Sequence, residues 1–266
     1  MSGGARRLLT FLGAHAVPGI ETWDGETYAR TLALSHGAGV VSLRAADGGL
    51  AQTFDGHQAD ADEARARVAH LCGLDDDTRP AERALGADRH LASLVALRPG
   101  LLRPGSVDHA ETLVRTVVGQ QVSLAGASVA AGRLVAAAGT PLERPSSGLT
   151  HLFPTPAQLA ALDPETLPMP RARGRCVVAL AAALAADPSL VEDDAALLAL
   201  PGIGPWTVDY TRFRTRRDPD VWLATDLAVR RQMEAMRIDP AVAVTWSPYR
   251  STVMMHLWAA YLEGRR

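Results

Sequence analysis

Hydrophobic positions near the start of the chain change from helical spacing to alternation. Leucines within residues 8–12 predict a short helix that stops near Pro18. The stretch 22–34 is rich in Thr and aromatic residues, as strands are. Apolar and polar residues then alternate over 41–45 and again over 50–54, on either side of an Asp-Gly-Gly turn at 47–49. This pattern predicts an antiparallel sheet near the N-terminus.

Beyond the sheet, the apolar spacing is that of helices. Residues 64–71 predict an amphipathic helix that ends at Gly73. Asp108, with Glu111 three residues later, predicts a capping box at the start of a long helix. The segments 125–138 and 177–186 are rich in Ala, which favours helix.

The last predicted helix has Ser247 as its N-cap and Pro248 in its first turn. We therefore expect an α+β fold in two parts. Residues 1–88 form a mixed N-terminal domain with an antiparallel sheet, and residues 89–266 form an all-helical domain.

Composition narrows the function classes. No run of apolar residues approaches the roughly 18 needed to cross a bilayer, and no cleavable leader opens the chain, so we expect a soluble, cytoplasmic protein. Cys72 and Cys176 lie far apart without a metal-ligand spacing, which favours buried structural thiols. The net charge of −2 argues weakly against a nucleic-acid partner.

Charged residues gather in runs of one sign. Acidic runs lie at 75–77 and 192–194, and arginines cluster at 171–175, 212–217 and 230–231. Two interpretations stay open, a surface with a basic and an acidic side, or ordinary solvated faces. All 27 basic residues are arginine, so no lysine can form a Schiff base with a sugar.

The most informative stretch, residues 200–207, reads LPGIGPWT. Two glycines flank one apolar residue between two helical runs, which predicts a tight turn whose second helix exposes N–H groups. Such a helix start suits a phosphate, because glycine lets the backbone approach the anion and the helix dipole favours negative charge. An ordinary helix-helix turn with Gly as C-cap is the alternative.

This stretch resembles the L-P-G-x-G-x-x-T hairpin of the helix-hairpin-helix DNA glycosylases. That superfamily has its catalytic aspartate about twenty residues later, at a helix start, and Asp226 within the run ATDLAVRR takes that place here. The chain also resembles the AlkA-type 3-methyladenine DNA glycosylase II family along nearly its whole length. The matching blocks are 11–12, 28–33, 118–123, 153–156 and 248–251.

The resemblance implies that Asp226 is catalytic. Cleavage of a nucleoside develops positive charge on the sugar, and a carboxylate about 4 Å away supplies roughly 4 kcal/mol at an effective dielectric near 20. A plain N-terminal helix cap is the alternative for Asp226. Lyase-competent relatives carry their lysine where this chain has Trp206, so the resemblance implies hydrolysis without strand cleavage.

Further roles follow from the same resemblance. Gln121 takes the place of a wedge that fills the gap left by a flipped nucleotide, with a capping glutamine as the alternative. Aromatic residues in the positions of a base pocket are Trp206, Tyr210 and Trp258, with Phe11 as a fourth. Their rings would stack on a cationic alkylated purine, and core packing is the alternative.

The resemblance also implies how DNA and an ion are held. The DNA-binding hairpin residues would be Gly202, Gly204 and Thr207. A monovalent cation, Na⁺ or K⁺, would bind the backbone carbonyls of Leu198, Leu200 and Ile203, and no other cofactor is expected. The fold would be half of a TATA-binding-protein-like sheet packed on two helical subdomains.

We therefore expect a monomeric, monofunctional DNA-3-methyladenine glycosylase that acts on double-stranded DNA containing alkylated bases, with no membrane partner. A non-catalytic helix-hairpin-helix protein that binds damaged DNA is the main alternative. A lyase-type glycosylase is a third. Whether the protein is free-standing or part of a fusion with an alkyl-transfer protein stays open.

Overall fold

The computed structural model describes residues 2–47 and 49–264, so Gly48 of the predicted turn lies outside the described residues. The first part of the chain is a four-stranded antiparallel sheet in the order β1-β2-β3-β4 with helices on one face. Its elements are α1 (Ser2–Ala14), β1 (Glu21–Trp23), β2 (Thr27–Leu34), β3 (Gly37–Ala46), β4 (Gly49–Asp55), the short 3-10 turn η1 (Gln58–Asp60) and α2 (Ala61–Cys72). We call this part the sheet domain.

Alternation gives the sheet a buried and an open face. Tyr28 pairs with Leu43 across β2 and β3, and both side chains are fully buried. They pack against Leu8 of α1 and Val68 of α2, so both helices cover this face. The stretch 22–34, which has the composition of strands, holds two of them, because Asp24 accepts hydrogen bonds from the N–H groups of Glu26 and Thr27 and closes a turn.

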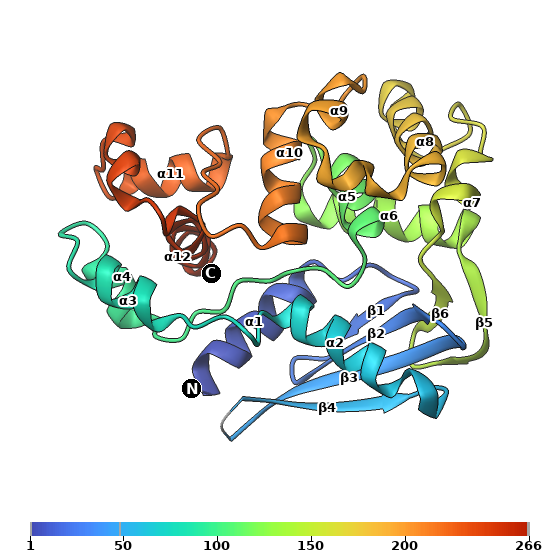
Figure 1. Cartoon of the computed structure of the whole chain (residues 1–266), viewed down its shortest axis with the longest axis horizontal. Coiled ribbons are helices and arrows are strands. Elements are labelled where there is room, and N and C mark those ends of the chain that lie inside the picture. Colours follow the sequence, from blue (N-terminus) through green and yellow to red (C-terminus); the bar gives the residue numbers. More distant parts are fainter. Residues whose placement is uncertain (1, 48, 265–266) are drawn as a thin grey trace.

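The rest of the chain is mostly helical and forms two lobes. Its elements are α3 (Arg79–Gly86), α4 (Ala92–Leu97), α5 (His109–Val118), α6 (Leu124–Ala138), β5 (Thr140–Ser146), β6 (Leu149–Leu152), α7 (Pro156–Ala160), α8 (Arg171–Ala186), η2 (Pro188–Glu192), α9 (Asp194–Ala199), α10 (Pro205–Thr211), the π turn η3 (Arg212–Arg216), α11 (Leu227–Ala235), η4 (Pro240–Trp246) and α12 (Arg250–Glu263). The central lobe holds α5 to α10, and the C-terminal lobe holds α3, α4, α11 and α12. Figure 1 shows the C-terminal lobe on the left, the central lobe on the right and the sheet domain below.

Each unit has its own hydrophobic core. The central core includes Leu113, Leu134 and Leu180, and the C-terminal core includes Met233 and Leu257. Leu85 of α3 packs in the C-terminal core, although it precedes residue 88. Whether the chain divides into folding units at residue 88 stays a prediction.

The prediction that everything after residue 88 is helical was wrong at one place. β5 and β6 form an antiparallel hairpin, and Thr31 of β2 donates a hydrogen bond to the carbonyl of His151 in β6. Most of β5 is exposed, so it lacks the alternation that marks a strand in sequence. The hairpin extends the sheet domain's contact with the central lobe.

The start of the last helix was also predicted wrongly. Helix α12 begins at Arg250 with Tyr249 as N-cap, and the hydroxyl of Ser247 donates to the carboxylate of Asp220 instead. At α5, Asp108 does cap the helix by accepting from the N–H of Glu111. None of the helices that the structure describes combines the length and apolar character that crossing a bilayer requires.

Candidate active site

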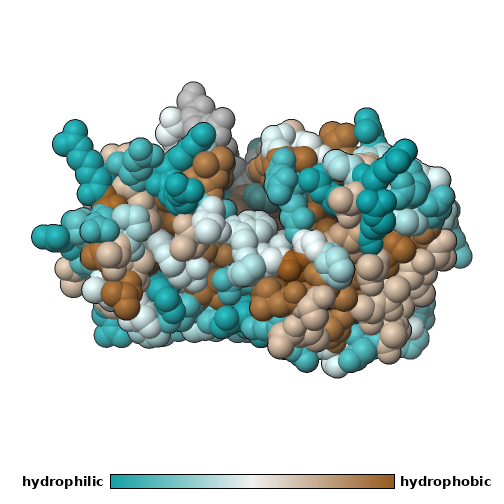
Figure 2. Space-filling view, turned by 90° about the horizontal axis from the view of Figure 1, so that it is seen from above, coloured by the Kyte–Doolittle hydropathy of each residue, from teal (hydrophilic) through white to brown (hydrophobic). Residues whose placement is uncertain are grey.

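A cleft of about 1260 Å³ opens where the three units meet. Seen from above, the surface is hollowed between two lobes (Figure 2). Nine predicted site residues line this cleft: Phe11, Gln121, Gly202, Gly204, Trp206, Thr207, Tyr210, Asp226 and Trp258. The structure thus brings together residues that lie up to 247 positions apart in the chain.

Asp226 is the N-cap of α11 and is half-buried in the cleft wall. Its Oδ1 atom accepts hydrogen bonds from the N–H groups of Ala228 and Val229, both at 3.0 Å, and from the indole N–H of Trp258 at 3.0 Å. No described residue donates to Oδ2. The carboxylate is therefore held through one oxygen and keeps the other available.

The aromatic residues form a connected wall beside Asp226. Trp206 and Tyr210 stack with ring centroids 5.2 Å apart and planes 11° from parallel. Trp258 lies 6.2 Å from Tyr210 and edge-on to Phe213. Trp206 and Tyr210 are partly exposed, so this wall offers ring surface to the cleft rather than only to the core.

Arg214 places a fixed positive charge in the same wall. Its guanidinium lies 5.8 Å from the Phe11 ring centroid and 5.7 Å from that of Tyr210. It donates to the Tyr210 hydroxyl at 2.9 Å and twice to the carbonyl of Gly105. Two of the four predicted cation-binding rings, Phe11 and Tyr210, thus already face a cation of the protein, which leaves Trp206 and Trp258 for a charged ligand.

The two hairpin glycines are needed for different reasons. Gly202 has a φ of +89°, and a Cβ there would lie 2.9 Å from the sulfur of Cys176. Gly204 is the N-cap of α10, and a Cβ there would meet no atom within 4 Å. The backbone is therefore closely packed behind Gly202 and open in front of Gly204.

The loop between α5 and α6 is joined to this hairpin. The side chain amide of Gln120 donates to the Gly202 carbonyl and to the Thr207 hydroxyl, both at 3.0 Å. Thr207 is only 2% exposed, so it holds the loop against the hairpin, and its role in DNA binding stays a prediction. The neighbouring Gln121 is exposed and has a left-handed backbone, with φ 55°.

The three carbonyls predicted to bind a cation lie outside the cleft lining. The oxygens of Leu198 and Ile203 accept no hydrogen bond from the described residues, whereas that of Leu200 accepts one from the N–H of Ile203. Open carbonyls at the end of a helix are acceptors without a partner. Within the described part of the chain, no group of three or more His, Cys, Asp or Glu side chains could hold a metal ion.

Buried charges form the floor of the cleft. Arg30 bridges Glu21 of β1 at 3.1 Å and Glu111 of α5 at 2.8 Å, and Arg115 contacts the same two carboxylates. Burial alone would raise the pKa of Glu21, but the charges of Arg115 and Arg30 outweigh it and lower that pKa to about 2. This network locks the sheet domain to the central lobe.

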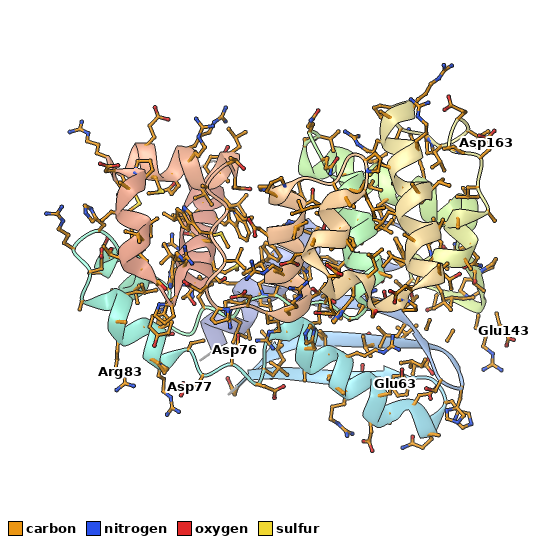
Figure 3. The ribbon with its side chains drawn as sticks, turned by 45° about the horizontal axis from the view of Figure 1, so that its top comes forward. Glu63, Asp76, Asp77, Arg83, Glu143 and Asp163 are labelled. Carbon is orange, nitrogen blue, oxygen red and sulfur yellow. The ribbon has the colours of Figure 1, made fainter. Side chains whose placement is uncertain are left out.

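Apart from Arg214, the arginines of the run at 212–217 are neutralised rather than free. Their ion pairs join Arg212 to Asp218, Arg216 to Glu192 and Asp194, and Arg217 to Asp76. Asp76, which also pairs with Arg103, lies near the middle of the molecule in Figure 3, whereas Asp77 and Arg83 lie at its lower edge. The acidic and basic runs therefore pair with each other, and the interpretation as two oppositely charged sides does not hold for these runs.

The residues that sequence reasoning missed are Arg214, Gln120 and the charged floor. One signal was available for Arg214, because it follows Tyr210 by four residues and so shares its helix face. Gln120 and Thr207 lie 87 positions apart, so the local pattern of hydrophobic and polar residues could not predict their contact.

Comparison with known proteins identifies the family. Residues 4–108 match the family described as the AlkA N-terminal domain. The chain is 42% identical over 266 aligned positions to the "Probable bifunctional transcriptional activator/DNA repair enzyme AlkA" of Mycobacterium tuberculosis, covering 93% of this chain and 53% of that protein. The chain thus spans about half the length of that relative.

Two further proteins match over nearly their whole length. The "DNA-3-methyladenine glycosylase 2" of Escherichia coli is 34% identical, with 97% of this chain and 93% of that protein covered. The solved structure of the 3-methyladenine DNA glycosylase from Archaeoglobus fulgidus superposes with a TM-score of 0.79 at 18% identity, covering 96% of this chain and 94% of that one, which confirms the fold. The chain belongs to the AlkA-type 3-methyladenine DNA glycosylase II family of the helix-hairpin-helix superfamily.

Proposed function

We propose that this chain is a monofunctional glycosylase that removes 3-methyladenine and related cationic purines from double-stranded DNA by hydrolysis. The observation that carries the proposal is the Asp226 carboxylate, fixed through Oδ1 and open at Oδ2 in an aromatic cleft. The full-length match to the Escherichia coli glycosylase supports the same activity.

Asp226 acts on the sugar. When the bond between C1′ and the base nitrogen breaks, its electron pair neutralises the cationic base and leaves positive charge on the sugar. The Oδ2 oxygen stabilises that charge and accepts the proton of the attacking water. The products are free base, an abasic site and one proton.

Hydrolysis is favoured over lyase chemistry because the chain has no lysine. Trp206 stands at the position where the lyase-competent relatives carry their nucleophile. An indole forms no Schiff base, so a water molecule attacks the sugar and the DNA strand stays intact.

The base lies against the indole rings of Trp206 and Trp258, which Arg214 does not contact. Trp206 presents a partly exposed face, Trp258 lies beside Tyr210 and is 9% exposed, and Leu227, which is 58% exposed, also lines the cleft. Stacking a cationic purine on an indole contributes roughly 0.5 to 2 kcal/mol. The two tryptophans therefore select for a flat, charged base.

Gln121 and its neighbours support the flipped-out state of the nucleotide. Gln121 is exposed beside Val122 and Leu124, which are 42% and 37% exposed. A left-handed backbone at a residue other than glycine costs about 1 kcal/mol, and such strain collects at functional sites. Gln121 enters the gap in the duplex, and the two apolar neighbours contact the flanking bases.

The hairpin holds the DNA backbone. The open face of Gly204, at the start of α10, receives a phosphate. The carbonyls of Leu198 and Ile203 are free to hold a Na⁺ or K⁺ ion, whose charge would draw the phosphate to the hairpin. The monomeric state and cytoplasmic location stay predictions.

The test compares wild type with Asp226→Asn on methylated duplex DNA, with the released bases separated by chromatography. Asparagine still caps α11, so the variant should fold. Asp193→Asn is the matched control, because Asp193 caps α9 in the same way outside the cleft. We expect wild type and the control to release 3-methyladenine and Asp226→Asn to lose at least a hundredfold in rate.

The alternative, a protein that binds damaged DNA without cutting it, makes the opposite prediction. Wild type would then release no base yet retain affinity for DNA containing an abasic site. Trapping with borohydride separates the third possibility, because only a lyase forms a reducible adduct with DNA.

A further inference from the structure

Arg231 is the one exposed arginine among the described residues that line the cleft. Of the others, Arg30 and Arg115 are paired with the buried carboxylates of the floor, and Arg214 is half-buried against two rings and a backbone carbonyl. Arg231 forms an ion pair with none of the carboxylates that the structure describes. The cleft wall therefore carries an accessible positive charge at this position.

Contacts within the C-terminal lobe hold Arg231 in the cleft lining. Leu227 and Arg231 lie four residues apart on α11, so they share a helix face, and both line the cleft. The Nη1 atom of Arg231 donates to the hydroxyl of Tyr261 in α12 at 3.3 Å. The guanidinium makes no other hydrogen bond to the described residues, so most of its N–H donors stay available for a ligand.

The position of Arg231 relative to Asp226 suits a phosphate. An α-helix rises about 1.5 Å per residue, so Arg231 lies about 7.5 Å further along α11 than its N-cap Asp226. Each nucleotide within a strand has a phosphate on either side of its sugar, so a sugar at Asp226 brings two phosphates into this part of the cleft. A guanidinium is always charged, and its fork of N–H groups matches two oxygens of a phosphate.

The hairpin provides the other contact with the strand. Gly204 and Arg231 line the same cleft but belong to different lobes, with α10 in the central lobe and α11 in the C-terminal lobe (Figure 1). A phosphate bound at each residue would hold the strand on both sides of the flipped nucleotide. The sugar between them would then be fixed at Asp226, and such positioning lowers the barrier because the reacting groups need no further ordering.

We propose that Arg231 is a positioning residue that binds a phosphate adjacent to the flipped nucleotide and so anchors the damaged strand to the C-terminal lobe. This inference rests on the proposed function. It extends the contact with the DNA backbone from the hairpin to the opposite wall of the cleft. A phosphate contact fixes the register of the strand and carries no sequence information.

The first test measures the affinity for a duplex with an abasic site at several salt concentrations. Arg231→Gln removes the charge, and we expect Kd at low salt to rise about tenfold and the slope of log Kd against log salt concentration to fall by about one. Arg231→Lys keeps the charge and should restore most of the affinity and the slope.

Arg230→Gln is the matched control. Arg230 is the neighbouring exposed arginine on α11 and lies outside the cleft lining, so this variant removes the same charge from the same helix. Because a charge without a phosphate contact is screened by salt, we expect its Kd to change by less than about twofold.

The second test neutralises the phosphates one at a time. A methylphosphonate replaces the phosphate on the 5′ or on the 3′ side of the abasic site in otherwise identical duplexes. We expect one of the two replacements to weaken binding by wild type and by Arg230→Gln and to have no further effect on Arg231→Gln, because the contact is already lost.

Equal salt slopes for Arg231→Gln and Arg230→Gln overturn the inference, and so do methylphosphonate losses that are the same in Arg231→Gln as in wild type. A defect in folding alone would lower the affinity without the change in slope. If wild type binds the abasic duplex no more tightly than undamaged duplex and releases no base from methylated DNA, the proposed function fails instead.

Discussion

At the residue scale, Asp226 combines two tasks that sequence patterns treat as alternatives. Its Oδ1 caps α11 and accepts the Trp258 indole hydrogen, while Oδ2 accepts no hydrogen bond from the described residues. Three donors on one oxygen restrict the carboxylate to one orientation, which spares the cost of ordering it when the charge on the sugar develops. The cap is therefore part of the proposed catalytic geometry and not a competing explanation.

Trp258→Phe tests this orientation. Phenylalanine keeps an aromatic ring but loses the N–H that donates to Oδ1 at 3.0 Å. A hydrogen bond to a charged group contributes about 1.5 to 3 kcal/mol, so we expect the rate of base release to fall at least tenfold while affinity for DNA with an abasic site changes little.

Trp246→Phe provides the comparison, because its indole donates to the Asp88 carboxylate at 3.1 Å in the C-terminal core. Equal rates for wild type and Trp258→Phe in single-turnover experiments would show that the indole does not orient Asp226.

At the element scale, much of the arrangement follows from sequence. Alternation predicted β3 and β4, helical spacing predicted α1 and α2, and alanine-rich composition predicted α6 and α8. Strand β5 was not predicted, because its side chains are mostly exposed. The start of α12 was predicted too early in the sequence, because the Ser247 hydroxyl binds Asp220 instead of capping the helix. The spacing of hydrophobic residues indicates which face of an element is buried. It does not predict an element that is stabilised by backbone hydrogen bonds or by a partner distant in the sequence.

The network between β1, β2 and α5 predicts a pH-dependent stability. The pKa of Glu21 is about 2 in the folded protein against 4.5 in the reference state, a difference worth about 3 kcal/mol. Because the folded pKa is lowered, this stabilisation is complete above pH 4.5 and is lost as the pH falls toward 2.

We therefore expect Glu21→Gln to lower the free energy of unfolding by about 3 kcal/mol at pH 7, measured by urea denaturation, and the difference to narrow below pH 4.5. Glu26→Gln removes an ion pair with Arg44 that is exposed on both sides, so it should change stability by less than about 1 kcal/mol. A difference for Glu21→Gln that is constant from pH 7 to pH 3 would contradict the assignment.

At the scale of the whole molecule, the site exists only because three separate cores surround one cleft. The family resemblance of this single sequence predicted nine of the residues that line the cleft. It did not predict Arg214, whose guanidinium is anchored on Gly105, 109 positions away. Nor could the sequence show that the run at 212–217 pairs with acidic runs from two distant segments, because charge patterns do not specify their partners.

Acid should destabilise the whole molecule through its buried histidines. Burial in the C-terminal lobe, together with the charge of Arg98, lowers the pKa of His256 to about 4 from 6.5. The unfolded chain therefore binds a proton between pH 6.5 and 4 that the folded protein excludes, so stability falls as the pH drops through this window. Between pH 7.5 and 5, His256 alone should cost about 2 kcal/mol, and His15 adds to this loss.

His256→Phe removes the titrating group and keeps a ring of similar size in the core. We expect its free energy of unfolding, relative to wild type, to rise by about 2 kcal/mol when the pH is lowered from 7.5 to 5, as measured by urea denaturation at each pH. The exposed His57, replaced in the same way, should show no such change. If the two variants respond alike to pH, then proton exclusion at His256 is not what makes the fold acid-sensitive, and the loss of stability must come from carboxylates such as Glu21, whose pairing fails only at lower pH.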